Sequence, residues 1–310
     1  MGESRIGMSA LIQIGDVHSA DALRAVASVP HPERANGFSV AFARGLVNFF
    51  SWDPASSAAD DGASVLKPND RTGAGRWVRV SLGAPADPAT ILGASLIQWC
   101  RADLGVTLNG STVAAWADQS GNGHHYAQGI AGQQPLYNAT GGPNGQASML
   151  FDGANDTLSA AGLDLAAPAT TPSWFWFIFR QITWTSGDRV FSGAGGMQLL
   201  QNTGTPQLDM FDGSVANGNT AATLNTYLRG EIYFSGSVAD YLKLGATSVT
   251  GASAGNTNPG APFSIASNSA GSQFAHIEVC EFLVADALPS AGQRSSLDAY
   301  VTARYGAGLV

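Results

Sequence analysis

A histidine pair beside an acidic turn is the first feature of this sequence that could do chemistry. In WADQSGNGHHYAQ, residues 116–128, Asp118 precedes the glycines of the turn, and His124 and His125 follow them. Adjacent residues of a regular strand point to opposite faces, so the two histidines should not bind one metal ion. An aspartate before glycines also accepts hydrogen bonds from nearby backbone amides. The pattern therefore predicts a structural turn, and Asp118 and Asn122 are its candidates for contact with a ligand or cation.

A second loop offers three more side chains that could contact a cation. FDGANDTLS, residues 151–159, carries Asp152, Asn155 and Asp156 after a predicted strand. Calcium prefers several oxygen ligands, which such a loop could supply in part. However, the spacing is not that of an EF-hand, and acidic and amide residues beside glycine are common in turns. We therefore expect no cofactor, with Ca²⁺ as the alternative.

Acids arranged for catalysis are sparse. HIEVCEF places Glu278 and Glu281 three residues apart, which puts them on opposite faces of a regular strand and unable to flank one glycosidic bond. YLKLG, residues 241–245, resembles the tyrosine and lysine motif of jelly-roll polysaccharide lyases, but the arginine–glutamate–arginine strand and the Gln-x-His motif of those enzymes do not appear. We expect no enzyme, and keep a polysaccharide lyase or hydrolase as the less favoured alternative.

Aromatic residues in or near predicted loops could stack on sugar rings. Trp184, Tyr137 and Tyr227 are the candidates for this contact, and Tyr241 lies in a similar position. Core or turn positions would explain each of them equally well. The sequence indicates no cleft that would bring them together.

The elements that must position these residues are mostly short strands. Charged residues make up only 12% of the 310-residue chain and glycines number 38, which favours turns over long helices. Both faces of SWFWFIFRQI are apolar, which predicts a central strand covered on both sides. Ser290 and Gln293 form a capping box before a helical stripe that ends at Gly306. The other predicted strands of this part lie in SLIQWCRA, STVAAWAD, ASMLFDG, RVFSG, MQLLQN, PQLDMF, YLRGEIYFSG, YLKLGA, FSIAS and HIEVCEFLVAD.

A proline-bearing stretch without periodicity, GAPADPAT, predicts a domain boundary near residue 84. Before it, SADALRAVASVP predicts a short helix, and GFSVAFARGLVNFFSWD predicts a hairpin with strands over 38–42 and 46–52. Further short strands are expected near Val65 and over 77–80.

Composition excludes some partners. The formal net charge is −8 and no cluster of five basic residues occurs, so we expect no nucleic acid as a partner. The longest strongly apolar run, residues 174–179, is far shorter than a membrane span needs, so we expect no membrane insertion. The first residues do not have the pattern of a secretory signal, which predicts synthesis in the cytoplasm.

An ordered set of segments carries a family resemblance over residues 95–306. These segments are IQWCRADLGVTLNGSTVAAWADQSGNGHHYAQ, QQPLYN, NGQASMLFDGANDTLS and EFLVADALPSAGQRSSLDAYVTARYG. Together they resemble the concanavalin A-like, laminin-G-like jelly-roll domains of bacterial and bacteriophage proteins. The resemblance implies an all-β fold for residues 85–310: an antiparallel jelly-roll sandwich whose first and last strands lie side by side, with a terminal helix packed against it. If those strands pair, Cys100 and Cys280 could approach each other, although free buried thiols are the favoured state.

Residues 22–80 carry a second resemblance. ALRAVASV, a hairpin ending in FFSWDPASSAADDGASVLKP, and GAGRWVRV resemble a small module near the start of bacteriophage tail-spike and tail-fibre proteins. This implies that residues 1–84 form a β-rich attachment or oligomerisation module with one short helix, and that the protein sits on a virion.

On these resemblances we expect a bacteriophage virion structural protein. Its partners would be other virion proteins, bound through residues 1–80, and further copies of the chain, with a trimer favoured. The sandwich would bind a host-surface polysaccharide. The alternative is a capsid or tail decoration protein without a glycan ligand.

Overall fold

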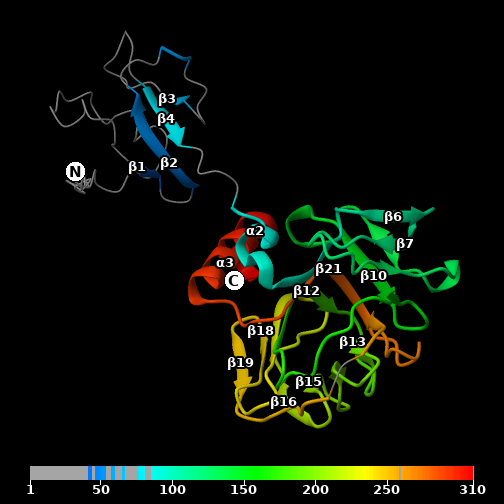
Figure 1. Cartoon of the computed structure of the whole chain (residues 1–310). Helices are drawn as coiled ribbons and strands as arrows, with labels where there is room; N and C mark the ends of the chain where they lie inside the picture. Colours follow the sequence, from blue (N-terminus) through cyan, green and yellow to red (C-terminus); the bar gives the residue numbers. More distant parts are fainter. Residues whose placement is uncertain are drawn as a thin grey trace. The chain divides into compact units, whose positions relative to one another are not determined.

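The computed structural model describes residues 41–43, 46–53, 57–59, 65–66, 76–80, 85–257 and 260–309. Its contacts divide the chain into two compact units, Met1–Ala84 and Pro85–Val310 (Figure 1). The functions predicted for the two parts are not tested by this division. The predicted helix near residue 19 lies outside the described residues.

The first unit contains a small antiparallel sheet. Its strand order is β1-β2-β4-β3. The predicted hairpin is present in the described residues, because β1 pairs antiparallel with β2; residues 38–40 of its first predicted strand lie outside them. The two further predicted strands are present as β3 and β4. The strands are β1 (Ala41–Ala43), β2 (Leu46–Asp53), β3 (Val65–Leu66) and β4 (Arg76–Val80).

The second unit is built around one large antiparallel sheet that closes on itself like a barrel. The all-β class is confirmed at this level. The first and last strands, β5 and β21, pair antiparallel. The strands are β5 (Leu96–Arg101), β6 (Val106–Asn109), β7 (Thr112–Trp116), β8 (Tyr126–Ala127), β9 (Leu136–Asn138), β10 (Ser148–Asp152), β11 (Leu158–Ala160), β12 (Ser173–Gln181), β13 (Arg189–Gly193), β14 (Gln198–Gln201), β15 (Leu208–Phe211), β16 (Val215–Asn219), β17 (Tyr227–Phe234), β18 (Tyr241–Leu244), β19 (Thr247–Thr250), β20 (Phe263–Ile265) and β21 (His276–Ala285).

Strand β12 lies between β17 and β21 and divides the apolar residues into two cores. Its alternating side chains point to opposite faces of the sheet. Phe175, Phe177 and Phe179 enter the main core, where Phe175 stacks on Phe191 with ring centroids 4.9 Å apart. Trp174, Trp176 and Ile178 enter a second core on the other face. The predicted double coverage of this strand is confirmed.

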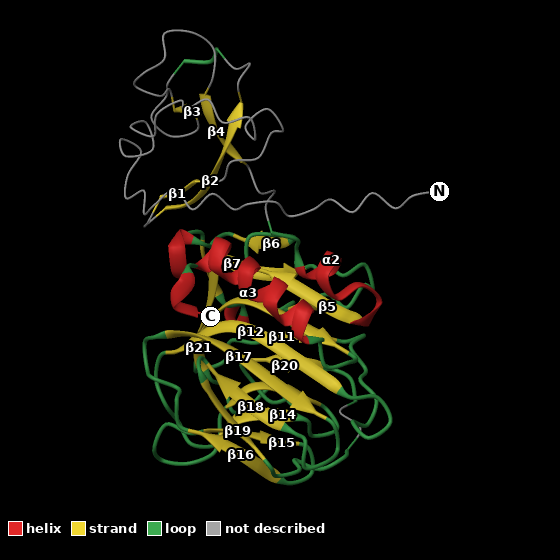
Figure 2. Ribbon diagram, turned by 90° about the vertical axis from the view of Figure 1, so that its left-hand side faces the viewer, coloured by secondary structure: helices red, strands yellow, loops and turns green. Residues whose placement is uncertain are grey.

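Two helices cover that other face of the sheet (Figure 2). The short helix α2 spans Pro88–Leu92, and the longer helix α3 spans Ala291–Tyr305. The predicted capping box of α3 is present, and the helix ends before Gly306 as expected. Leu297, Tyr300 and Val301 of α3 pack into the second core. Within the described residues, no helix combines the length and apolar character needed to cross a membrane.

An irregularity in β21 corrects the sequence prediction for its two glutamates. Opposite β12, Arg180 pairs with Glu278 but Ile178 pairs with Glu281, so Cys280 is an extra residue in a bulge. Because Ile178 and Arg180 share one face of β12, the two glutamates also share one face. The expectation of opposite faces assumed a regular strand and is wrong.

The pairing of β5 with β21 does not bring the two cysteines together. Although β5 pairs with β21, Cys100 lies opposite Phe282 rather than Cys280. Cys100 packs in the main core and Cys280 in the second core, and both thiols are buried and free.

Candidate functional site

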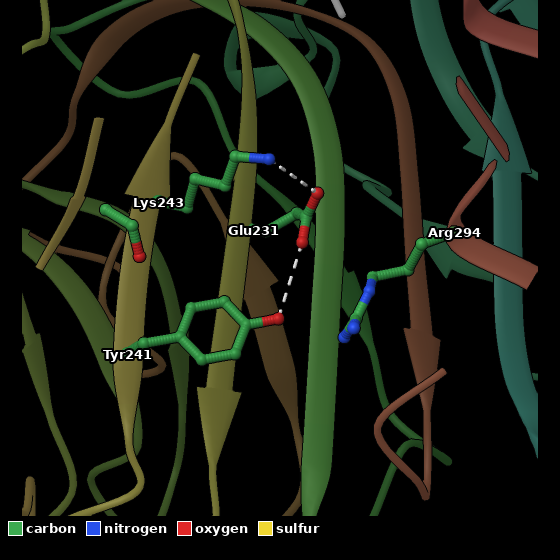
Figure 3. A pocket seen from close by; sticks show the side chains of 5 residues that line it. Glu231, Tyr241, Lys243 and Arg294 are labelled. Carbon is green, nitrogen blue, oxygen red and sulfur yellow. Dashed lines mark hydrogen bonds and ion pairs between the residues drawn. The ribbon is translucent and has the colours of Figure 1, made fainter. Parts of the chain in front are cut away.

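A cavity of about 180 Å³ opens on the helix-covered face of the sheet, beside α3 (Figure 3). Three of its residues form one row across neighbouring strands, because Glu231 of β17 pairs with Lys243 of β18, which pairs with Ser248 of β19. Paired residues project from the same face, so the backbone register alone gathers these side chains. Tyr241 of β18 and Arg294 of α3 complete the lining.

Glu231 is the polar centre of this cavity. Its side chain is 7% exposed, and its Oε1 lies 3.4 Å from Arg229 and 3.7 Å from Lys243. Its Oε2 accepts a hydrogen bond of 3.3 Å from the Tyr241 hydroxyl. Arg229 also forms an ion pair with Asp298 of α3. A buried charge with partners on several sides stays in place, and Glu231 is therefore a fixed acceptor at the bottom of the cavity.

The Tyr241 hydroxyl is held from two sides. It accepts a hydrogen bond of 3.1 Å from the Trp174 indole and donates to Glu231. Burial, together with the nearby charge of Glu231, raises the pKa of Tyr241 well above its usual range. The phenol therefore keeps its proton at neutral pH.

Arg294 reaches the cavity from the first turns of α3. The helix start is fixed by the Ser290–Gln293 capping box and by a 3.0 Å hydrogen bond from the Gln293 amide to the Ile91 carbonyl. The Arg294 side chain points toward Tyr241 and Glu231 (Figure 3). The cavity thus combines one carboxylate, two cations, a phenol and a hydroxyl.

The turn around Asp118 is organised by its own hydrogen bonds. Asp118 Oδ1 accepts from the amides of Trp99 and Ser120 at 2.9 and 2.8 Å, and Oδ2 accepts from Ser120 Oγ and the His124 amide at 2.8 and 3.0 Å. The Asn122 side-chain amide donates to the carbonyls of the first two residues of β5, Leu96 and Ile97. The histidines lie before β8 rather than on a strand, and His125 Nδ1 accepts from the Asp118 amide. This geometry is that of a structural turn.

The second predicted loop is also internally bonded. Asp152 Oδ1 accepts from the backbone amides of residues 154, 155 and 156, at 2.8 to 3.4 Å. These hydrogen bonds hold the pKa of Asp152 below its usual value despite burial. Burial raises the pKa of Asp156 to about 6. The Asn155 side chain is exposed, and no interaction joins this loop to Asp118 or Asn122 among the described residues. Within those residues, no group of three histidine, cysteine or acidic side chains could hold a metal ion.

The three predicted stacking residues do not converge. Trp184 packs against the main core and donates from its indole to the Thr203 carbonyl at 2.5 Å. Tyr137 lies in β9 and also packs on that core. Tyr227 begins β17; its hydroxyl donates to the Gly141 carbonyl, and Arg180 lies over its ring at 5.0 Å. Each of these residues therefore has a packing role.

The sequence patterns did not predict four residues of the cavity: Glu231, Lys243, Ser248 and Arg294. A usable signal was present, because alternation places Arg229 with Glu231 on one face of LRGEIYF. It places Tyr241 with Lys243 on one face of YLKLG. Pairing the two segments as a hairpin would have joined these sets.

No protein-family model matches the chain, and no curated protein matches its sequence. Several solved structures are similar in fold. One is a sialidase from Trypanosoma rangeli in complex with sialic acid, with 11% identity and a TM-score of 0.48, over 86% of this chain and 44% of the sialidase. Another is domain 4 of a GH43 extracellular arabinanase from Geobacillus stearothermophilus in complex with arabinotriose, with 13% identity and a TM-score of 0.49, over 66% of this chain and 98% of that domain.

A third similar structure is an arabinofuranosidase complexed with arabinofuranosyl-α-1,2-xylobiose, with 14% identity and a TM-score of 0.47, over 64% of this chain and 51% of the enzyme. The chain thus spans about half the length of the sialidase and of the arabinofuranosidase.

These structures overturn two predictions. The chain was expected to be a bacteriophage virion structural protein, whereas the similar structures come from glycoside hydrolases, so this prediction is wrong. The prediction that the protein is not an enzyme is contradicted by the same structures. The comparisons lend no support to the tail-spike or concanavalin A-like resemblance. Their identities and TM-scores are too low to assign a substrate or a site to this chain. The proposal below therefore rests on the cavity.

Proposed function

We propose that residues 85–310 form a carbohydrate-active domain and that the cavity between β17, β18, β19 and α3 binds a saccharide. One observation carries this proposal: Glu231, Lys243 and Ser248 lie in one row across three strands and share a cavity with Tyr241. Sugar hydroxyls both donate and accept hydrogen bonds, and this row offers a fixed acceptor, a cationic donor and a hydroxyl.

The size of the cavity limits what it holds. Its volume of about 180 Å³ is below the range of roughly 300–1,000 Å³ that is typical of pockets for drug-sized ligands. We therefore propose that a single sugar residue, at a chain end or in a side branch, enters it. The ring of Tyr241 supplies an apolar surface beside the polar row.

The second candidate function is glycoside cleavage at the same cavity. The observation that favours it is the 3.3 Å hydrogen bond from Tyr241 to Glu231. Tyrosine can replace a carboxylate as the nucleophile of a glycosidase. Glu231 would take the phenolic proton as Tyr241 Oη bonds to the anomeric carbon and the bond to the leaving oxygen breaks, with a proton from solvent on that oxygen. Water would then attack the anomeric carbon and release a proton to solvent, while Tyr241 Oη leaves and takes its proton back from Glu231.

We also propose that residues 85–310 have a jelly-roll architecture. The pairing of β5 with β21 and the packing of α3 over them support it. The homotrimer remains a prediction that the molar mass of the protein in solution would test.

A glycan array with the full chain tests the binding proposal. We expect specific binding that Glu231→Gln weakens about tenfold or more, because an amide cannot replace a carboxylate that orders three partners. Asp286→Asn removes a carboxylate outside the cavity and should leave binding unchanged. Binding that is unaffected by Glu231→Gln, or no binding to any glycan, would overturn the proposal. Release of reducing ends from a bound glycan, lost in Glu231→Gln, would support cleavage.

A further inference from the structure

The charges of the cavity do not cancel. Its lining holds the two cations Lys243 and Arg294 but the single carboxylate of Glu231. Arg229, the next cation, is matched by Asp298. The cavity therefore keeps an excess positive charge on a chain whose formal net charge is −8. Such local reversal of sign attracts an anionic group into the cavity.

Arg294 is the source of the excess. In residues 85–257 and 260–309, no carboxylate lies within 4.0 Å of its guanidinium. By contrast, the arginines at positions 101, 180, 229 and 304 each have an acidic partner, and Arg189 donates to the Gln198 side chain and the Gly187 carbonyl. A guanidinium is a rigid fork of N–H donors that matches the two oxygens of a carboxylate. Within the part of the chain that the structure describes, this fork of Arg294 has no hydrogen-bond or ion-pair partner, and it is directed at the cavity (Figure 3).

Lys243 faces the same space with a loosely held charge. Its ammonium lies 3.7 Å from Glu231, and its side chain is 31% exposed. Glu231 already has Arg229 and Tyr241 as partners at 3.4 and 3.3 Å, so Lys243 can turn to a second anion without leaving Glu231 unpaired. The cavity thus offers an anion two cationic groups from opposite walls, one on β18 and one on α3.

We propose that the saccharide bound here is acidic, with its carboxylate held between Arg294 and Lys243 and its hydroxyl groups directed to Glu231 and Ser248. This inference rests on the proposed function and specifies the ligand class of that same cavity. A neutral sugar would leave Arg294 desolvated and unpaired, which penalises its binding. The preference for an acidic over a neutral saccharide therefore has two sources: the ion pair with Arg294, and the cost of leaving that guanidinium unpaired.

Matched pairs of oligosaccharides that differ only at C6 test this inference. The probes are gluco-, galacto- and mannotrisaccharides, each as the neutral form and as the uronic acid form, titrated calorimetrically into the full chain. We expect at least one uronate to bind about tenfold or more tightly than its neutral partner. Raising the salt concentration should reduce this difference.

Two variants and one further probe test whether the preference for uronates depends on Arg294. Arg294→Gln should remove most of the difference between acid and neutral forms, whereas Ser295→Ala, an exposed position on the same helix, should preserve it. Acetate at the same concentration should not displace the uronate, because the sugar hydroxyls also contribute. Displacement by acetate would show that the site takes any carboxylate and would overturn the saccharide part.

The outcomes distinguish a failure of the acidic-sugar inference from a failure of the proposed saccharide binding. Equal affinity for acid and neutral forms would overturn the acidic-sugar inference and leave the proposed function intact. An acid preference that survives in Arg294→Gln would also overturn the inference. Failure of all six oligosaccharides to bind would overturn the inference and count against the proposed function, which the glycan array then decides separately.

Discussion

Two glutamates on the same face of the sheet, Glu281 and Glu231, have different surroundings beside α3. Glu281 is fully buried and accepts hydrogen bonds of 2.6, 2.9 and 2.6 Å from Trp99, Tyr300 and Tyr305. Glu231 is nearly as buried, but it lies at the edge of the helix-covered area and borders a cavity. Among the described residues, Glu231 shares its cavity with Arg294, a cation that has no carboxylate within 4.0 Å, whereas Glu281 borders no such cavity.

The difference shows that α3 gives a structural role to the polar residues it covers and leaves those beside its start free to bind a ligand. Where α3 covers the sheet, two tyrosines from the helix and its end satisfy Glu281 and fix the helix to the strand below. Where the helix begins, Glu231, Lys243 and Ser248 of the sheet line a cavity instead of packing against the helix. We therefore expect changes at Glu281 to affect folding and changes at Glu231 to affect binding.

The largest effect is expected from Glu281→Ala. This change leaves three buried donors without an acceptor, and should lower the free energy of unfolding by about 3–5 kcal/mol. The matched variant Glu231→Gln should lower it by less than about 1 kcal/mol, because Arg229 keeps Asp298 as its partner. Urea unfolding measures both. Equal losses in the two variants would break the contrast between the two glutamates.

The pH dependence of stability sharpens the same contrast. Burial raises the pKa of Glu281 above its usual value, so the folded state holds the proton more tightly than the unfolded state. The stability that this group contributes is complete below a pH of about 4.3 and is lost as the pH rises through the raised pKa.

Unfolding titrations of the wild type and Glu281→Gln from about pH 4 upward should show the stability advantage of the wild type shrinking as the pH rises. Asp156 and Asp212, whose pKa values burial raises to about 6, act in the same direction but equally in both proteins. A difference that is independent of pH would contradict the assignment.

A smaller effect is expected from Tyr241→Phe. Its hydroxyl is the acceptor of the Trp174 indole, which is fully buried, and removing it should cost about 1 kcal/mol of stability. Saccharide binding should weaken as well, because Glu231 loses a partner. The control is Tyr233→Phe, whose ring lies 5.9 Å from that of Tyr241 but does not line the cavity. Similar losses in both variants would count against a specific role of the Tyr241 hydroxyl.

The smallest effect concerns cations at the two acidic turns. Each oxygen of Asp118 already accepts two hydrogen bonds, from its own turn and from β5, and the Oδ1 atom of Asp152 accepts three within its loop. Removing calcium with a chelator should therefore change the melting temperature by less than about 1 °C. A larger fall, restored by Ca²⁺ alone, would show that one of these turns is a cation site.

Local patterns predicted the fold well. Alternating aromatic residues identified β12 as the central strand, and a capping box with a terminal glycine identified α3, because both signals depend on neighbours in sequence. The bulge at Cys280 has no comparable signal, since it arises from pairing with β12. One extra residue was enough to reverse the predicted facing of Glu278 and Glu281.

The candidate site was predictable only in fragments. Asp118 and Asp152 stood out because acidic residues beside glycine are visible in the sequence, yet their hydrogen bonds serve their own turns and, for Asp118, the neighbouring strand β5. The cavity draws its residues from three strands and from a helix about fifty positions further on. The pairing of Glu231 with Lys243 and the approach of Arg294 depend on register and packing, which no local pattern specifies.

The guanidinium of Arg294 provides the most direct test of the central claim, that this cavity binds an acidic saccharide. Its Nε–H resonance can be followed by NMR while the uronate oligosaccharides are titrated into the protein. We predict a saturable shift at Arg294, with little change at Arg180 and Arg304, which already have acidic partners. An unchanged Arg294 signal during saturable binding of a uronate would place the ligand elsewhere and contradict the claim.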